Sequence, residues 1–148
     1  MLMVNREYPS QPIVGVGVVI IKEGCVLIVK RGNAPGKGKW AIPGGLVGLG
    51  ESLTSAAVRE VLEETNLKIT LGDVAGVFDY IEQDSKGGIR FHYVIIDFFA
   101  NNVEGSAKPS SDVEAIAWVD FNDIYKYELT SSTRKLMQKI LSTKLKIN

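Results

Sequence analysis

The sequence GGLVGLGE at residues 44–51 is followed, seven residues later, by REVLEE at residues 59–64. In an α-helix, Glu60, Glu63 and Glu64 stand at positions i, i+3 and i+4 and therefore share one face. Their like charges repel by about a few tenths of a kcal/mol per pair, near a helix C-terminus whose dipole also disfavours negative charge. A divalent cation would offset this repulsion, and carboxylate oxygens suit Mg²⁺ or Mn²⁺. The pattern indicates a metal site, with a solvated acidic face as the alternative.

Residues 52–65 are predicted to form the helix that carries these glutamates, with its first residue, a serine, as the N-cap. Arg59 precedes Glu63 by four residues and could pair with it. Ala56 and Ala57 are expected to lie beneath the carboxylates and to leave space above the helix. The opposite face is expected to pack on a sheet, and it comprises Val58, Val61, Leu62 and Thr65.

The rest of the chain alternates apolar, β-branched runs with polar turns. Gly15 and Gly17 alternate with valines in the first run, which favours a strand that another backbone can approach closely. Strands are predicted at 14–21, 25–30, 74–82, 91–100 and 115–119, and a closing helix at 131–141. This order predicts a single α+β domain over residues 1–148, with a mixed β-sheet between helices on both faces.

The composition narrows the class of protein. The chain has 148 residues, of which 45% are hydrophobic, so a packed core is expected. Seventeen Lys and Arg residues balance seventeen Asp and Glu residues, which disfavours a general nucleic-acid binder. The one cysteine, Cys25, lies beside an apolar run and reads as a small core residue. Without an apolar run of about 18 residues or a signal peptide, we expect a soluble, cytoplasmic protein with no membrane partner.

The acidic helix and the glycine-rich segment before it resemble the Nudix box, a glycine, glutamate and Arg-Glu-x-x-Glu-Glu pattern of nucleotide hydrolases. Asn66 stands where the family has a glycine, but asparagine also tolerates the left-handed conformation that ends a helix. Gly48 stands where related sequences often carry a glutamate, so an auxiliary metal ligand there is missing. The pattern falls on Gly45, Glu51, Arg59, Glu60, Val61, Glu63, Glu64 and Leu67.

The resemblance extends from about residue 14 to residue 118 and implies the family's α/β/α sandwich. It also implies that the three helix glutamates are the principal metal ligands, with Mg²⁺ as the ion and Mn²⁺ as a substitute. Glu51 would support the loop before the helix and reach the metal through water. Arg59 would orient a glutamate through a charge-assisted hydrogen bond. Gly44 and Gly45 would form a tight turn with backbone N–H groups near phosphate.

The resemblance also bears on the base that activates water. It would be one of the box glutamates or, as in members that resemble ADP-ribose pyrophosphatases, an acid in a later loop. Asp112 and Glu114 are the candidates in that loop, and Glu114 joins Arg59 and the helix glutamates in the predicted catalytic set.

Besides Gly44 and Gly45, four residues are candidates for binding the substrate. Trp40 could stack on a base or pack in the core, and Phe78 and Tyr80 could wall a base pocket or serve as core aromatics. Arg31 follows a strand and could contact phosphate or remain a solvated charge.

The implied reaction is hydrolysis of a nucleoside diphosphate linked to another group, with ADP-ribose giving AMP and ribose 5-phosphate as the leading case. One alternative is a nucleoside triphosphate pyrophosphohydrolase acting on damaged nucleotides such as 8-oxo-dGTP. An alternative from a different functional class is a non-catalytic nucleotide sensor, which would be expected to have lost the glutamates of the Nudix box. A homodimer is implied by resemblance only.

Overall fold

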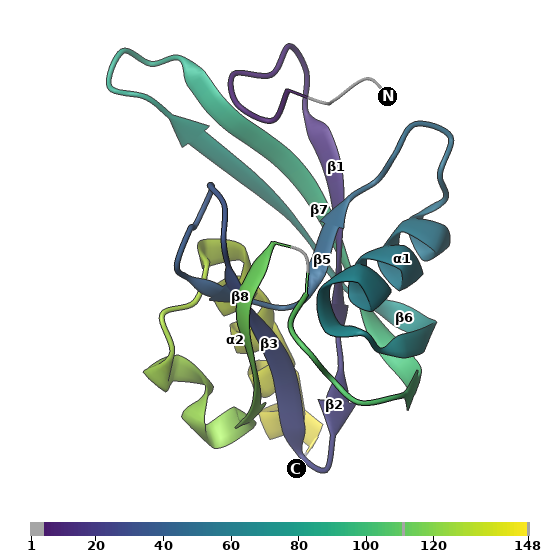
Figure 1. The fold of residues 1–148 in the computed structure, drawn as a ribbon. Helices are drawn as coiled ribbons and strands as arrows, with labels where there is room; N and C mark the ends of the chain where they lie inside the picture. Colours follow the sequence, from purple (N-terminus) through teal and green to yellow (C-terminus); the bar gives the residue numbers. More distant parts are fainter. Residues whose placement is uncertain (1–4, 111, 148) are drawn as a thin grey trace.

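The computed structural model describes residues 5–110 and 112–147, with the backbone alone described for residues 144–147. Within these ranges no helix is both long enough and apolar enough to cross a membrane. The elements follow in the order β1 (Ile13–Val19), β2 (Ile21–Lys22), β3 (Cys25–Arg31), β4 (Trp40–Ala41), β5 (Gly44–Leu46), α1 (Leu53–Thr65), β6 (Lys68–Gln83), β7 (Ile89–Glu104), β8 (Val113–Asp120), η1 (Phe121–Lys126) and α2 (Ser131–Ile147) (Figure 1).

The strands form two sheets. The first has the order β5-β1-β7-β6, in which β1 and β7 are parallel and the other pairs are antiparallel. In the second, β3 pairs antiparallel with β2, β4 and β8. The predicted mixed sheet is therefore confirmed in the first sheet, and the predicted α+β sandwich is confirmed as a whole. The two short strands β4 and β5 were not expected from the sequence, because two or three residues carry no readable alternation.

The glycines of β1 allow close approach, as their pattern predicted. Gly17 pairs with Gly44 on one side and with Asp97 on the other. A Cβ atom on Gly44 would collide with the backbone carbonyl of Val16, so only glycine fits at this point.

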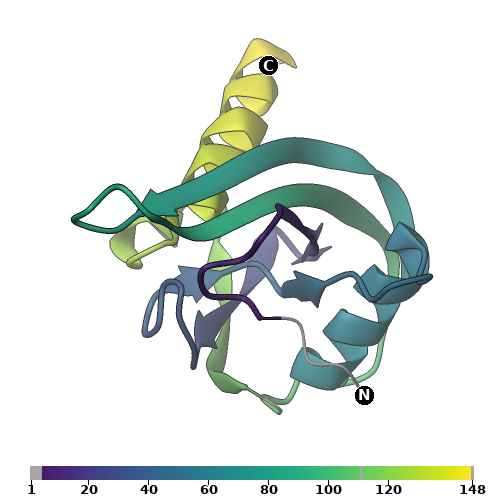
Figure 2. The ribbon, with the colours of Figure 1, turned by 90° about the horizontal axis from the view of Figure 1, so that it is seen from above.

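Two apolar clusters hold the helices on opposite sides of the curved first sheet (Figures 1 and 2). One cluster joins α2 to the second sheet and to η1 through Leu136, Met137 and Ile140. The other joins α1 to β1, β6 and β7, with Ala56, Ala57 and Val61 at its centre.

The buried face of α1 differs from the prediction. Ala56 and Ala57 are fully buried against the core rather than leaving open space above the helix, and Leu62 is 42% exposed. The helical periodicity explains the difference. The buried face of α1 consists of the two alanines, Val61 and Thr65, and Leu62 lies outside it. Two of the three acidic positions border this face, so their side chains start at the edge of the core.

The ends of α1 follow local chemistry. The Ser52 hydroxyl accepts a hydrogen bond from the backbone N–H of Ser55 at 3.1 Å, which confirms the predicted N-cap. Asn66 has φ 65° and ψ 12°, and its N–H bonds the carbonyl of Leu62. The asparagine thus adopts the left-handed conformation in which the family pattern has glycine.

Candidate active site

A cavity of about 630 Å³ lies where α1, the loop after β3 and the concave part of the first sheet meet. Glu60, Glu63 and Glu64 border it from α1, and Arg31 borders it from the end of β3. The cavity therefore brings the carboxylates together with a cationic side chain.

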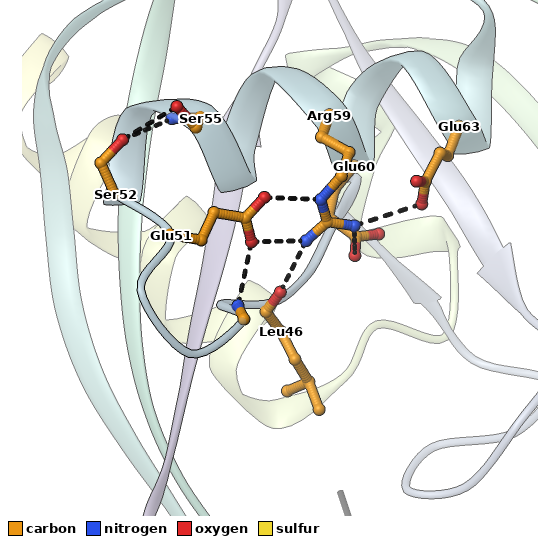
Figure 3. Close-up of polar contacts among 8 residues, drawn as sticks. Leu46, Glu51, Ser52, Ser55, Arg59, Glu60 and Glu63 are labelled. Atoms are coloured by element: carbon orange, nitrogen blue, oxygen red, sulfur yellow. Dashed lines mark hydrogen bonds and ion pairs between the residues drawn. The ribbon is translucent and has the colours of Figure 1, made fainter. Parts of the chain in front are cut away.

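Arg59 is the organising residue beside this cavity (Figure 3). Its Nε and Nη2 atoms donate to the two carboxylate oxygens of Glu51 at 2.7 Å and 2.9 Å. Nη2 also donates to the carbonyl of Leu46 at 3.0 Å, and Nη1 donates to Glu60 at 2.8 Å and to Glu63 at 3.3 Å. The guanidinium thus fixes the loop before the helix and two of the helix carboxylates at once.

Glu51 is not among the residues that line the cavity. One of its oxygens also accepts from the backbone N–H of Gly48 at 2.9 Å. The hydrogen bonds from Arg59 and then Gly48 hold the pKa of Glu51 at about 2, so the carboxylate is charged and fully engaged. Its role in this structure is to support the loop.

Glu60 packs its carboxylate against the Cα of Gly45, where any Cβ would collide with it. Burial raises the pKa of Glu60, and the hydrogen bond from Arg59 counteracts part of that effect. Gly44 and Gly45 lie in the strand β5 rather than in the predicted tight turn, and the missing side chain of Gly45 makes room for this carboxylate.

Glu64 is the most enclosed of the three glutamates. Burial raises its pKa to about 7, against a hydrogen bond from the Gly44 N–H at 2.9 Å and the attraction of Arg31. The repulsion of Glu60 and Asp112 adds to the rise. The N–H of Gly44, expected near phosphate, bonds this carboxylate instead. A half-buried carboxylate with so little compensation is poised to gain from a cation.

The donor set fits a hard divalent cation by chemistry and by position. Glu60, Glu63 and Glu64 supply carboxylate oxygens from one turn of helix to one cavity. Within the described ranges, no three His, Cys, Asp or Glu side chains converge closely enough to form a finished metal site. In the conformation seen, Glu60 and Glu63 accept hydrogen bonds from Arg59, and Glu64 accepts one from the N–H of Gly44.

A basic loop forms the opposite wall. Arg31, Lys37 and Lys39 border the cavity from residues 31–39, together with Gly36. The Arg31 Nε donates to the carbonyl of Pro35 at 2.7 Å, and burial lowers the pKa of its guanidinium. An inward-facing arginine agrees with the predicted phosphate contact more closely than with a solvated strand end.

The later loop offers one of its two acids to the cavity. Both side chains are exposed. Asp112 lines the cavity and its charge acts on Glu64, whereas Glu114 lies beside the cavity-lining Gly32 without lining the cavity itself. Asp112 and Glu114 therefore both stay predicted candidates for the base.

The same loop closes the end of α1. The N–H of Lys108 donates to the carbonyl of Thr65 at 2.9 Å, and that of Ser110 to the carbonyl of Glu64 at 3.1 Å. These bonds satisfy carbonyls that a helix end leaves free, and they fix Asp112 close to the acidic turn.

The predicted aromatic residues divide into two groups. Tyr80 borders the cavity, and its hydroxyl donates to Glu82 at 2.9 Å. Trp40 and Phe78 do not border it. Trp40 packs edge-on against Tyr127 at 5.3 Å, and both Trp40 and Phe78 lie against the cluster around α2. For these two, the alternative of core packing is the one that the structure supports.

Asp97 was not singled out from the sequence. It borders the cavity from β7, is only 3% exposed, and has a pKa that burial raises to about 7. A signal was available, since Asp97 is the one charged residue in the apolar run YVIIDFFA of residues 93–100.

Comparisons with known proteins agree with this geometry. A model of the NUDIX domain matches residues 11–140. An ADP-ribose pyrophosphatase from Methanocaldococcus jannaschii is 35% identical over 115 residues, covering 78% of this chain and 66% of the relative. An oxidized purine nucleoside triphosphate hydrolase from Danio rerio is 31% identical over 109 residues, covering 72% of this chain and 65% of the relative. The chain thus spans slightly less than two thirds of the length of each.

A solved structure shows a similar fold. The MutT NUDIX hydrolase from Burkholderia pseudomallei matches with a TM-score of 0.79 and 30% identity, covering 88% of this chain and 99% of that one.

Proposed function

Because the chain belongs to the Nudix family, whose hydrolases act on small nucleotides and generally use a divalent metal, we propose that it cleaves the diphosphate bond of a nucleoside diphosphate derivative. ADP-ribose, yielding AMP and ribose 5-phosphate, is the leading substrate. The observation that carries this proposal is a single cavity with three carboxylates on one wall and a basic loop on the other. A diphosphate needs both, because its charge must be neutralised before water can attack.

Glu60, Glu63 and Glu64 would hold Mg²⁺, for which Mn²⁺ could substitute. A cation there supplies positive charge to the diphosphate oxygens and to the attacking water. Arg59 contributes by holding the Glu60 and Glu63 carboxylates in place. Its bonds to Glu51 and Leu46 in turn fix the position of the guanidinium.

The remaining steps belong to the chain's own residues. Arg31, Lys37 and Lys39 bind the phosphate oxygens and draw the nucleotide inward. Asp112 accepts the proton from water, because it stands beside the acidic turn and borders the cavity. Glu64 is the alternative acceptor, since its raised pKa suits proton transfer near neutral pH.

We take ADP-ribose as the leading substrate because a relative that is 35% identical is named an ADP-ribose pyrophosphatase. The second candidate is a damaged nucleoside triphosphate such as 8-oxo-dGTP, which the relative from Danio rerio supports. The sensor alternative is disfavoured, because every box glutamate is retained. A cytoplasmic location and a homodimer remain predictions of the sequence.

The test is release of phosphate and nucleotide from a panel of nucleotides with Mg²⁺, comparing the wild type with Glu63→Gln. Glu104→Gln, an exposed glutamate outside the cavity, is the matched control. We expect cleavage of ADP-ribose that is lost in Glu63→Gln and retained in the control. Preference for a triphosphate would instead indicate a pyrophosphohydrolase that acts on damaged nucleotides. Nucleotide binding without turnover would contradict the proposed hydrolase activity and support the nucleotide sensor.

A further inference from the structure

Asp97 is a buried acid without a partner. Only 3% of the residue is exposed, and within the part of the chain that the structure describes its side chain makes no hydrogen bond or ion pair. Burial is the one cause acting on its pKa, so no cation or donor compensates it. Because an uncompensated buried carboxyl costs free energy, a structure that keeps one facing a cavity invites a ligand that supplies the missing bond.

The residues around Asp97 leave open space beside its carboxylate. Gly17 lies directly opposite on β1, and a Cβ there would collide with both the Asp97 carboxylate and the side chain of Ile42. The glycine thus opens the space over which the carboxylate lies. Ile42 and Ile95 provide apolar surface nearby, and both also border the cavity.

The sheet fixes how far Asp97 lies from the acidic helix. Gly44, Gly17 and Asp97 occupy one row across the adjacent strands β5, β1 and β7. Two strand spacings separate Gly44 from Asp97 by about 10 Å. Since the N–H of Gly44 bonds Glu64, a ligand with its phosphates beside Glu64 can reach Asp97 only with a group several bonds away from them.

The distribution of charge in the cavity determines which end of the nucleotide can lie beside Asp97. The cations that line the cavity are Arg31, Lys37 and Lys39 in the loop after β3 and Arg6 before β1, and none of them acts on Asp97, so an anion beside Asp97 would meet an uncompensated acid. The apolar walls suit the flat face of a nucleobase better than a polyhydroxylated sugar. The group that reaches Asp97 must therefore be flat, uncharged and able to donate a hydrogen bond.

We propose that Asp97 determines substrate specificity by accepting a hydrogen bond from the exocyclic amino group of the substrate's nucleobase. This inference rests on the proposed function, because it takes the substrate to be a nucleotide whose phosphates bind at the acidic helix. For ADP-ribose the donor is the adenine amino group. The hypoxanthine counterpart carries an oxygen at that position and offers no donor there.

The experiment measures two quantities at pH 8.5, where Asp97 is ionised and only accepts hydrogen bonds. Calorimetry gives the Kd of AMP and of IMP, and kinetics give kcat/KM for ADP-ribose and for its hypoxanthine counterpart. We expect the wild type to favour the amino-bearing ligand at least about tenfold in both, the value of one hydrogen bond to a charged group.

Two substitutions test the residue itself. Asp97→Asn keeps the shape and adds a donor, so it should raise affinity for IMP and bring the ratio close to one. Asp97→Val removes the acceptor, so it should weaken AMP binding without improving IMP binding. Asp79→Asn, on the exposed face of the neighbouring strand β6, should leave the ratio unchanged.

The outcomes separate this inference from the proposed function. Equal binding of AMP and IMP by the wild type, or a ratio that Asp97→Asn leaves unchanged, overturns the role of Asp97 even if ADP-ribose is hydrolysed. Selective AMP binding that is lost in Asp97→Asn supports the role even if no nucleotide is turned over. The calorimetric readout requires no catalysis, so both results are informative.

Discussion

The guanidinium of Arg59 and the carboxylate of Glu51 form two parallel hydrogen bonds, from Nε at 2.7 Å and from Nη2 at 2.9 Å. The two residues are eight positions apart and belong to the helix and to the loop before it. Because the same guanidinium also bonds Glu60, the position of a cavity carboxylate depends on an ion pair outside the cavity. Removing that pair should therefore affect catalysis as well as folding.

Arg59→Lys tests this dependence. A lysine keeps the charge but cannot make the two-pronged contact with Glu51 or reach Leu46 at the same time. We expect kcat to fall at least about tenfold, because a small displacement of a positioning group is costly to catalysis, and the unfolding temperature to fall as well. Asp123→Asn removes the exposed pair with Lys126 and is the matched control, which should change neither. Wild-type kcat in Arg59→Lys would refute the link.

Substitutions of Asp112 and Glu114, the two acids of the late loop, should have different effects on kcat. Asp112→Asn is expected to lower kcat by about 10²-fold or more, the usual contribution of a general base, with little change in KM. Glu114→Gln should stay close to the wild type, because its side chain lies outside the cavity. Steady-state kinetics on ADP-ribose would measure both. The reverse pattern would assign the base to Glu114 instead of Asp112.

Stability should depend on pH through Asp97. Burial raises its pKa from 3.8 to about 7, so between these values the folded chain binds a proton that the unfolded chain releases. The stabilisation is complete below pH 4 and is lost as the pH rises through 7, by up to about 4 kcal/mol. Glu64 acts with the same sign. Chemical denaturation between pH 4 and pH 8 should therefore show a smaller loss in Asp97→Asn than in the wild type, and parallel curves would contradict the burial argument.

Asn66 gives a prediction about stability alone. Its φ of 65° is strained for most side chains and acceptable for asparagine or glycine. Asn66→Ala should lower the free energy of unfolding by about 1 kcal/mol, whereas Asn66→Gly should be close to neutral. Urea denaturation would measure both, and an alanine variant as stable as the wild type would show that the helix end can rearrange.

The sequence predicted the acidic helix because three glutamates at helical spacing, a serine cap and a helix-ending asparagine all agree. It placed β6 at residues 74–82, whereas the strand covers Lys68–Gln83. The β-bulges near Thr70 and Val74 explain the difference, because they interrupt the alternation on which strand prediction depends.

The candidate site was predicted less completely. Nothing in the order of residues says that Trp40 faces α2 while Tyr80 faces the cavity, since both are aromatic residues in strands. Asp112 and Glu114 are two positions apart, and the irregular start of β8 separates their surroundings. Asp97 is marked in the sequence as the one charged residue of its apolar run, but only the parallel pairing of β1 and β7 shows that it lies opposite Gly17.

That parallel pair also constrains how the protein folds. Residues 17 and 97, which face each other in the register, are 80 positions apart, and the loop between them contains the whole of α1 and β6. Closing so long a loop is entropically costly and tends to be slow. The base-reading position can form only when this late, non-local pairing is complete, even if the acidic helix forms earlier. A nascent or partly unfolded chain could therefore present its carboxylates before it can discriminate between nucleotides.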